Sequence, residues 1–145
     1  GNQIVMAAAA DSTSLALDKI DGFTSGVDQI DLFLALTGTT LNVGSPALDL
    51  TVVGASITSI GATETNLITM LNDQSNAIDL ASAGAFAAAG DTFVVKITGA
   101  SLAGTDVTYV VQNVGANDDV VSGVDTVIAL VGTSTTAPAG YDDFI

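Results

Sequence analysis

The clearest pattern of apolar and polar residues lies in the last third of the chain. Residues 92–98 and 107–112 alternate apolar and polar side chains, which is the period of strands with one buried face. Gly104-Thr105-Asp106 separates the two runs, so we expect them to pair as a hairpin. Residues 126–131 are apolar on both faces, which predicts a fully buried strand.

Shorter apolar runs, interrupted by Gly, Pro and Ser, indicate further strands in the first half of the chain. One short strand is expected within residues 1–10, and an apolar strand at 30–36. Three more short β segments are expected at 41–43, 48–53 and 57–60. Turn signals recur about every ten residues, a spacing typical of β-sandwiches, barrels and rolls.

Two segments have helical rather than strand character. Residues 64–71 repeat apolar side chains at helical spacing: Leu67, Met70 and Leu71. Residues 81–89 are rich in Ala and stop at a Gly, as a short helix does. The predicted fold is therefore mainly β, similar to the end of a β-roll or to a β-sandwich, with one or two short helices.

A phrase of sequence occurs twice, once in full and once in a shorter version. Residues 25–38 read SGVDQIDLFLALTG, and residues 122–132 read SGVDTVIALVG. Each version has a Ser-Gly turn, an apolar residue, an Asp, an apolar run and a closing Gly. The phrase predicts a turn that leads into a strand, with the Asp at the mouth of that strand.

The first version belongs to a series of aspartates: Asp11, Asp18, Asp21, Asp28 and Asp31. If residues 18–23 and 27–32 are neighbouring β segments joined by the turn at 24–26, their ends bring several of these carboxylates together. Carboxylates held by turns suit Ca²⁺, a hard cation that takes about six to eight oxygen ligands. The series therefore predicts at least one Ca²⁺ site. In the alternative interpretation, each Asp is a strand-end cap or a solvated surface group.

A second acidic group consists of Asp118, Asp119 and Asp125. These side chains are candidate donors for another Ca²⁺ site. The polar sequence around Asn117 favours an exposed turn instead. Asp91 and Asp106 stand just before expected strands, and we interpret them as turn residues.

Charge narrows the range of partners. The chain has 16 acidic residues against two lysines, no Arg and no His, for a net charge of −14. Such a surface argues against binding nucleic acid or an anionic membrane, since both require basic side chains. The carboxylates repel one another unless metal ions or salt compensate. No apolar run approaches the roughly eighteen residues of a membrane span.

Residues suited to catalysis are sparse. The chain has no Cys, and therefore no disulfide and no thiol nucleophile. A Ser or Thr nucleophile would lack a His base, although Lys19 or Lys96 could take that place. The sequence contains neither a phosphate loop nor a nucleophile elbow. We therefore expect a protein that is not an enzyme.

The sequence closes on an acidic pair followed by two apolar residues: Asp142, Asp143, Phe144 and Ile145. This segment is called the tail from here on. It is open to two interpretations, a recognition tag read by another protein or a final edge strand docked on the sheet. Residue chemistry alone does not separate them.

Taken in order, these motifs resemble the C-terminal region of RTX proteins, which are bacterial proteins exported by type I secretion. Residues 1–6 are similar to the last turn of a Gly/Asp-rich nonapeptide β-roll, and residues 11–32 to the segment after the roll. Later phrases follow in family order: Asp91-Thr92-Phe93-Val94-Val95, Thr108-Tyr109-Val110-Val111, Asp125-Thr126-Val127-Ile128 and Asp143-Phe144-Ile145. Residues 39–63 contribute least to the resemblance.

The resemblance implies a single C-terminal secretion and folding module over residues 1–145. Residues 1–38 would form the end of the β-roll, and residues 39–145 a β-rich body closed by an export signal. The module would fold outside the cell as Ca²⁺ binds, and an inner-membrane ABC transporter would read the tail as an uncleaved signal. Gln3 and Gly22 depart from the family pattern, which often has Asp at these positions. Asp18 and Asp28 remain the best candidate donors.

A second function is compatible with the same sequence. The composition is rich in Ala, Thr, Ser and Val and poor in Lys, which resembles surface-layer proteins exported by this route. The chain would then be a calcium-dependent surface-layer or adhesin domain that self-assembles into an oligomer or lattice. Either function places the protein outside a bacterium, secreted or on the cell surface.

Overall fold

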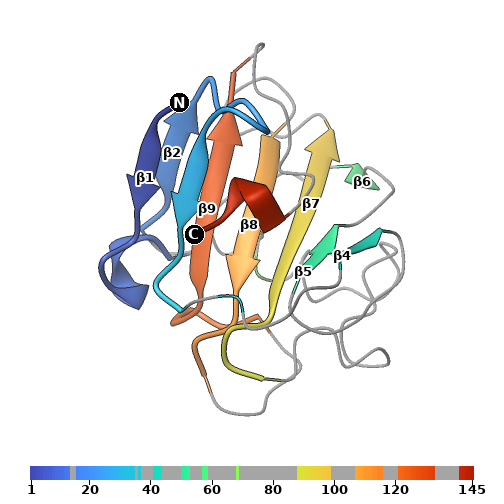
Figure 1. Cartoon of the computed structure of the whole chain (residues 1–145). Coiled ribbons are helices and arrows are strands. Elements are labelled where there is room, and N and C mark those ends of the chain that lie inside the picture. The colour runs from blue at the N-terminus through green and yellow to red at the C-terminus, as the bar shows by residue number, and fades with distance from the viewer. Residues whose placement is uncertain are drawn as a thin grey trace.

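Strands in two sheets make up the fold, which confirms the prediction of a mainly β protein (Figure 1). The computed structural model describes residues 1–13, 16–34, 36, 41–43, 50–52, 57–58, 68, 88–98, 107–115, 121–132 and 141–145. The predicted helices at 64–71 and 81–89 fall almost entirely outside these residues. In the described part of the chain, no helix has the length and apolar character needed to cross a membrane.

The larger sheet has seven strands, in the order β2-β9-β8-β7-β5-β4, and β6 also pairs with β7. The strands are β2 (Asp18–Asp21), β4 (Leu41–Val43), β5 (Leu50–Val52), β6 (Ile57–Thr58), β7 (Thr92–Thr98), β8 (Val107–Gln112) and β9 (Thr126–Val131). Strands β7, β8 and β9 are antiparallel to one another. The outer strands join this centre in parallel, β2 on β9 and β5 on β7.

The three central strands confirm the strand predictions, and their burial goes beyond them. All six residues of β8 are buried, so both of its faces are covered. The alternation in this segment predicted only one buried face. Thr108 and Gln112 lie on buried positions beside apolar neighbours, and Gln112 has hydrogen-bond partners that compensate for its lost hydration.

The smaller sheet consists of β1 (Gln3–Val5) and β3 (Gln29–Asp31), which run parallel. Their register pairs Gln3 with Gln29 and Ile4 with Ile30. On the other side of β3, Phe144 forms a parallel bridge with Ile30. Two short 3-10 helices complete the described elements, η1 (Ala9–Asp11) and η3 (Tyr141–Asp143).

The chain winds once around the molecule between β1 and β3. It leaves the smaller sheet after β1, contributes β2 to the larger sheet, and returns to place β3 beside β1. Paired positions in β1 and β3 are 26 residues apart, as for Gln3 and Gln29.

The hydrophobic core lies between the two sheets. Val94, Val110 and Ile128 form one row across β7, β8 and β9, in register. Side chains of the smaller layer pack against this row, and they are Met6, Phe23, Ile30, Leu32 and Phe144. Figure 1 shows the smaller sheet and the red C-terminal segment in front of the larger sheet. Burying these groups supplies most of the stability that positions the surface turns.

One predicted strand is shorter than expected. The apolar run at 30–36 predicted a strand of that length, but β3 ends at Asp31. Beyond it, the buried side chain of Gln112 replaces the missing strand partner. Its Nε2 donates to the Leu34 carbonyl at 2.6 Å, and its Oε1 accepts from the Leu34 N–H at 3.0 Å. The backbone N–H and C=O of Leu34 therefore both have hydrogen-bond partners, although no neighbouring strand pairs with this residue through them.

The hydroxyl of Tyr109 is buried and has no hydrogen-bond partner among the described residues. Burial raises the pKa of Tyr109 to about 12, from an ordinary value of 10.0. The unfolded chain ionises this phenol first, so stability is expected to fall as pH rises from about 10 to 12, by at most about 1.4 kcal/mol per pH unit. Tyr109→Phe should reduce this alkaline loss and preserve or raise stability at pH 7.

Urea unfolding of both proteins between pH 7 and pH 12 measures this effect. Tyr109→Phe retains the ring, so packing in the core is matched between the two proteins. Superimposable alkaline profiles would show that Tyr109 ionises as easily in the folded protein as in the unfolded chain.

Candidate functional site

Aspartates close several turns of the chain, two of them directly before strands β7 and β9. In each case a carboxylate oxygen accepts a hydrogen bond from a backbone N–H three residues earlier, and the Asp N–H donates back to that residue's carbonyl. The pairs are Asp11 with Ala8, Asp91 with Ala88 and Asp125 with Ser122. This is the turn chemistry expected of Asp, in which its short side chain replaces a backbone acceptor.

Asp28 closes a similar turn and also joins it to the first strand. Its Oδ2 accepts from the Thr24 N–H at 3.0 Å, and its Oδ1 accepts from the Asn2 N–H at 2.7 Å. The Asn2 side-chain amide donates to the same Oδ1 at 3.2 Å. These hydrogen bonds, that from the Asn2 N–H above all, hold the pKa of Asp28 below its ordinary value of 3.8.

The lowered pKa of Asp28 predicts a loss of stability in acid. The bonds to Asn2 and Thr24 favour the ionised carboxylate, so their contribution is present above about pH 4. It is lost as pH falls through the lower, folded-state pKa. Asp28→Asn should be less stable at pH 7 and should lose less on acidification. Urea midpoints from pH 6 to pH 2 test this, and equal acid slopes for the two proteins would contradict it.

Asp125 is fully buried and has three hydrogen bonds to neighbouring segments. Its Oδ1 accepts from the Val114 N–H at 3.0 Å. Its Oδ2 accepts from the Ser122 N–H at 2.7 Å and from the Ser122 hydroxyl at 3.0 Å. The carboxylate therefore joins the end of β8 to the turn before β9.

These contacts explain the repeated phrase. In both versions the Asp is buried and accepts hydrogen bonds from its own turn and from a distant backbone N–H. The valine before it points out of the fold, with Val27 57% and Val124 64% exposed. The phrase is a turn-closing unit that precedes a strand, which agrees with the alternative interpretation of these two aspartates as caps.

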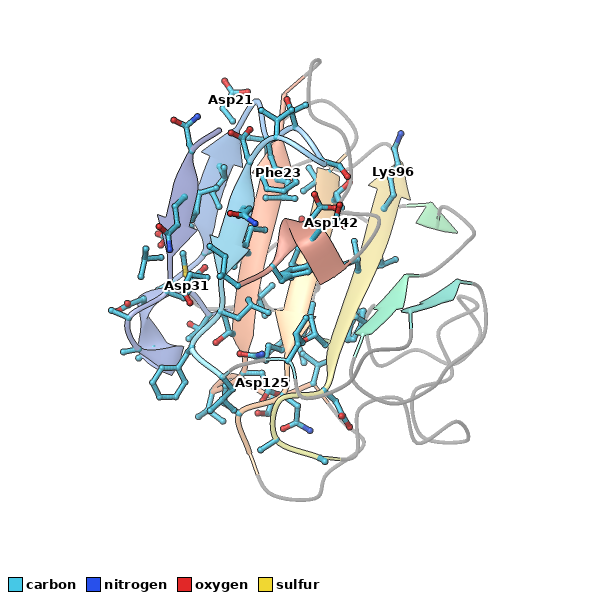
Figure 2. All side chains as sticks on the ribbon, viewed as in Figure 1. Asp21, Phe23, Asp31, Lys96, Asp125 and Asp142 are labelled. Carbon is cyan, nitrogen blue, oxygen red and sulfur yellow. The ribbon has the colours of Figure 1, made fainter. Side chains whose placement is uncertain are left out.

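The aspartate series does not converge on one place. Asp18 and Asp21 are exposed on β2 in the larger sheet, whereas Asp31 is on β3 in the smaller sheet. The condition for bringing them together, that residues 18–23 and 27–32 are neighbouring β segments, is not met by β2 and β3, which belong to different sheets. Figure 2 shows Asp21, Asp31 and Asp125 at separate places on the molecule.

Asp28 and Asp125 do not present free carboxylate oxygens to a Ca²⁺ ion. Both oxygens of Asp28 and of Asp125 face N–H groups, which are donors and compete with a cation. Within the described residues, no group of three or more acidic side chains is placed to hold a metal ion. Asp118 and Asp119, predicted as further donors, lie outside these residues.

The tail occupies a defined site on the turn before β3. Asp143 is buried, and its carboxylate accepts from the Ser25 hydroxyl at 2.7 Å and from the Gly26 N–H at 2.6 Å. The Gln29 side chain donates to the Asp142 carbonyl at 3.0 Å. Among its two interpretations, the structure therefore shows the docked one.

The apolar end of the tail continues this docking along β3. Phe144 is buried in the core, and the Ile145 N–H donates to the Ile30 carbonyl at 3.0 Å. Ile145 itself is 52% exposed. The tail thus combines a polar contact at Asp143 with an apolar contact at Phe144, in the position of a third parallel strand.

Local geometry makes the 24–28 turn a receptor for a carboxylate. Gly26 has a φ of +74°, a left-handed conformation that Gly adopts without a Cβ penalty. The N–H groups of Val27 and Asp28 are both used by the Thr24 carbonyl, which tightens the turn. Sequence reasoning identified Ser25 and Gly26 only as a turn. Their hydrogen bonds to Asp143 join residues that are 117 and 118 positions apart, so no local sequence pattern indicates this contact.

Comparison with known proteins leaves the site to be interpreted from its own geometry. No family model, curated protein or solved structure matches this chain. The features that bear on function are therefore the parallel pairing of β1 with β3, the aspartate turns and the docked tail.

Proposed function

We propose that this chain is a non-enzymatic C-terminal module for type I secretion of an RTX-type bacterial protein. The tail, residues 142–145, would be the signal that the ABC transporter reads. The observation that carries the proposal is the two-part character of the tail, a carboxylate at Asp143 followed by an apolar Phe144. Each part is specifically recognised by this chain itself.

Two further features support the proposal. The parallel pairing of β1 with β3, with β2 of the larger sheet between them in sequence, is compatible with the end of a nonapeptide β-roll. The net charge of −14 would disfavour a compact state inside the cell, where little Ca²⁺ is free to compensate. An extended chain is the form in which a terminal segment is accessible to a transporter.

Secretion of the chain by bacteria that express a type I transporter tests the proposal. Deletion of residues 142–145 should abolish export of the chain, measured as the fraction in the culture medium. Val124→Ala is the matched control, since this side chain is 64% exposed and distant in sequence from the tail. Equal export of the deleted and intact chains would overturn the proposal.

Calcium-assisted folding is the second part of the proposal. The described turn aspartates already have N–H partners, so the donors would be other carboxylates: the exposed Asp18 and Asp21, the half-buried Asp31, or Asp118 and Asp119. A cation that binds only the folded state raises its stability by mass action.

Thermal unfolding in EDTA and in millimolar Ca²⁺, with Mg²⁺ as the control, measures this linkage. A rise in Tm specific to Ca²⁺ is expected. Equal Tm values in EDTA and Ca²⁺ would contradict calcium-assisted folding and leave the export function to be judged by the secretion experiment.

A structural role in a surface layer or adhesin is favoured by one observation, the exposed apolar groups around the smaller sheet. Val5 of β1 is 54% exposed, Phe33 after β3 is 44% exposed and Ile145 is 52% exposed. Pairing places Val5 beside Asp31, and Ile145 follows the bridge partner of Ile30. Val5→Ser with Phe33→Ser should prevent assembly of purified protein under this alternative, and should leave assembly unchanged if the chain serves export alone.

A further inference from the structure

The tail and the turn before β3 meet as two separate pieces of the protein. Gly26 and Asp143 are 117 residues apart in sequence and are joined by a hydrogen bond of 2.6 Å. In the described tail, Asp143 and Phe144 are buried, whereas Asp142 and Ile145 are exposed, and so is Gly26. The contact therefore consists of a clamp at the buried Asp143 carboxylate and the buried side chain of Phe144.

We propose that the tail and residues 24–30 form a latch, in which the tail opens as a unit while β3 stays paired with β1 and the larger sheet remains folded. When closed, the latch hides the Asp143 carboxylate and the Phe144 ring. A transporter could not then recognise the docked tail, and this consequence rests on the proposed function. The folded module would then no longer present the signal that exported it.

The burial of the participating groups supports opening as a local event. Once the tail leaves, the Ser25 hydroxyl and Gly26 N–H are at the surface, where water replaces the lost acceptor. Strand β3 retains its pairing with β1 through Gln29 and Ile30. The central strands β7, β8 and β9 keep their complete ladders. Segments with few buried contacts open at lower free energy than the core of the same protein.

The same geometry assigns different roles to the two adjacent aspartates. Asp143 is buried and its carboxylate is the acceptor in the clamp. Asp142 is exposed, and its contact with Gln29 is through the Asp142 backbone carbonyl, which accepts from the Gln29 side chain. Replacing either Asp by Asn removes the same charge from neighbouring positions, so only the clamp distinguishes the two variants.

Amide hydrogen exchange of the full chain, followed by NMR, tests the latch. The Gly26 N–H reports the clamp and the Ile145 N–H reports the strand-like end of the tail. We expect both amides to share one opening constant, at least about 100-fold larger than that of the slowest β8 amides. Asp143→Asn should raise the opening constant of both amides about tenfold, and Asp142→Asn by less than about twofold.

Several results would overturn the latch. Gly26 and Ile145 could exchange only at the rate of the slowest β8 amides, which would make the tail inseparable from global unfolding. They could exchange as freely as unfolded amides, which would mean that the tail is not docked. Equal effects of Asp142→Asn and Asp143→Asn would assign the stabilisation to general charge rather than to the clamp.

The latch and the export function fail in distinguishable ways. Amide hydrogen exchange in the purified protein measures docking of the tail in the absence of a transporter. Secretion of the chain that lacks residues 142–145 measures the export signal independently of docking. If Gly26 and Ile145 share a local opening and the deleted chain is exported normally, the latch is supported and the export signal is overturned. If export is lost and both amides exchange only through global unfolding, the export signal is supported and the latch is overturned.

Discussion

Replacing Asp125 by alanine is expected to lower the free energy of unfolding by about 3 kcal/mol. The carboxylate is fully buried and accepts from the Val114 N–H, the Ser122 N–H and the Ser122 hydroxyl. Alanine would leave two backbone donors without their acceptor at the junction of β8 and β9. Equilibrium unfolding in urea at pH 7 measures the change.

Asp21→Ala is the matched control for this prediction. It removes the same charge, but Asp21 is exposed at the end of β2. In a chain of net charge −14, losing an exposed carboxylate should leave stability unchanged or slightly raised. A loss for Asp125→Ala no greater than that for Asp21→Ala would show that the turn does not depend on its carboxylate.

Replacing Phe144 by alanine is expected to lower the free energy of unfolding by about 3 kcal/mol as well. The ring is 7% exposed and packs in the core cluster with Ile30 and Phe23. Its removal leaves a cavity between the two sheets, at the position where the tail completes the smaller one. The same urea experiment provides the measurement.

Ile145→Ala serves as the control at the next position. This side chain is 52% exposed, and its hydrogen bond to the Ile30 carbonyl involves the backbone and survives the substitution. We expect a change within about 0.5 kcal/mol. Similar small losses for both variants would mean that Phe144 is not part of the core in solution.

The central strands could be predicted because their information is local. Residues 92–98, 107–112 and 126–131 have dense β-branched and aromatic side chains bounded by turns, and each forms a strand with these bounds. The hairpin between the first two followed from the short connection. Burial of both faces of β8 depends on the segments that pack against each face. The alternation of apolar and polar residues within the strand does not reveal those segments.

The failure at residues 30–36 has a non-local cause. The apolar run favours a strand, yet β3 stops at Asp31, and Leu34 is bound by the side chain of Gln112, 78 residues away. One buried amide satisfies both backbone groups of Leu34, so the segment has no need of a strand partner. Tertiary context overrides local propensity here.

The placement of the aspartates was predictable in part. Asp28, Asp91 and Asp125 each stand directly before a strand, which is the local signal for a turn cap that the structure shows. The separation of Asp18 from Asp31 required knowing that β2 and β3 belong to different sheets. The repeat of Asn2-Gln3-Ile4 at Asp28-Gln29-Ile30 is the sequence signal that indicates the parallel pairing of β1 with β3.

The pairing of β3 with the tail sets a minimum time for completing the fold. Gly26 is synthesised 117 residues before Asp143, so a β3 strand that formed during synthesis would have one edge open while most of the chain is still being made. At ribosomal rates of about 5–20 residues per second, this wait lasts roughly 6 to 23 seconds. An open strand edge kept for so long invites pairing with another chain. Lowering the concentration of nascent chains, or binding them to a chaperone during synthesis, should therefore raise the yield of folded protein.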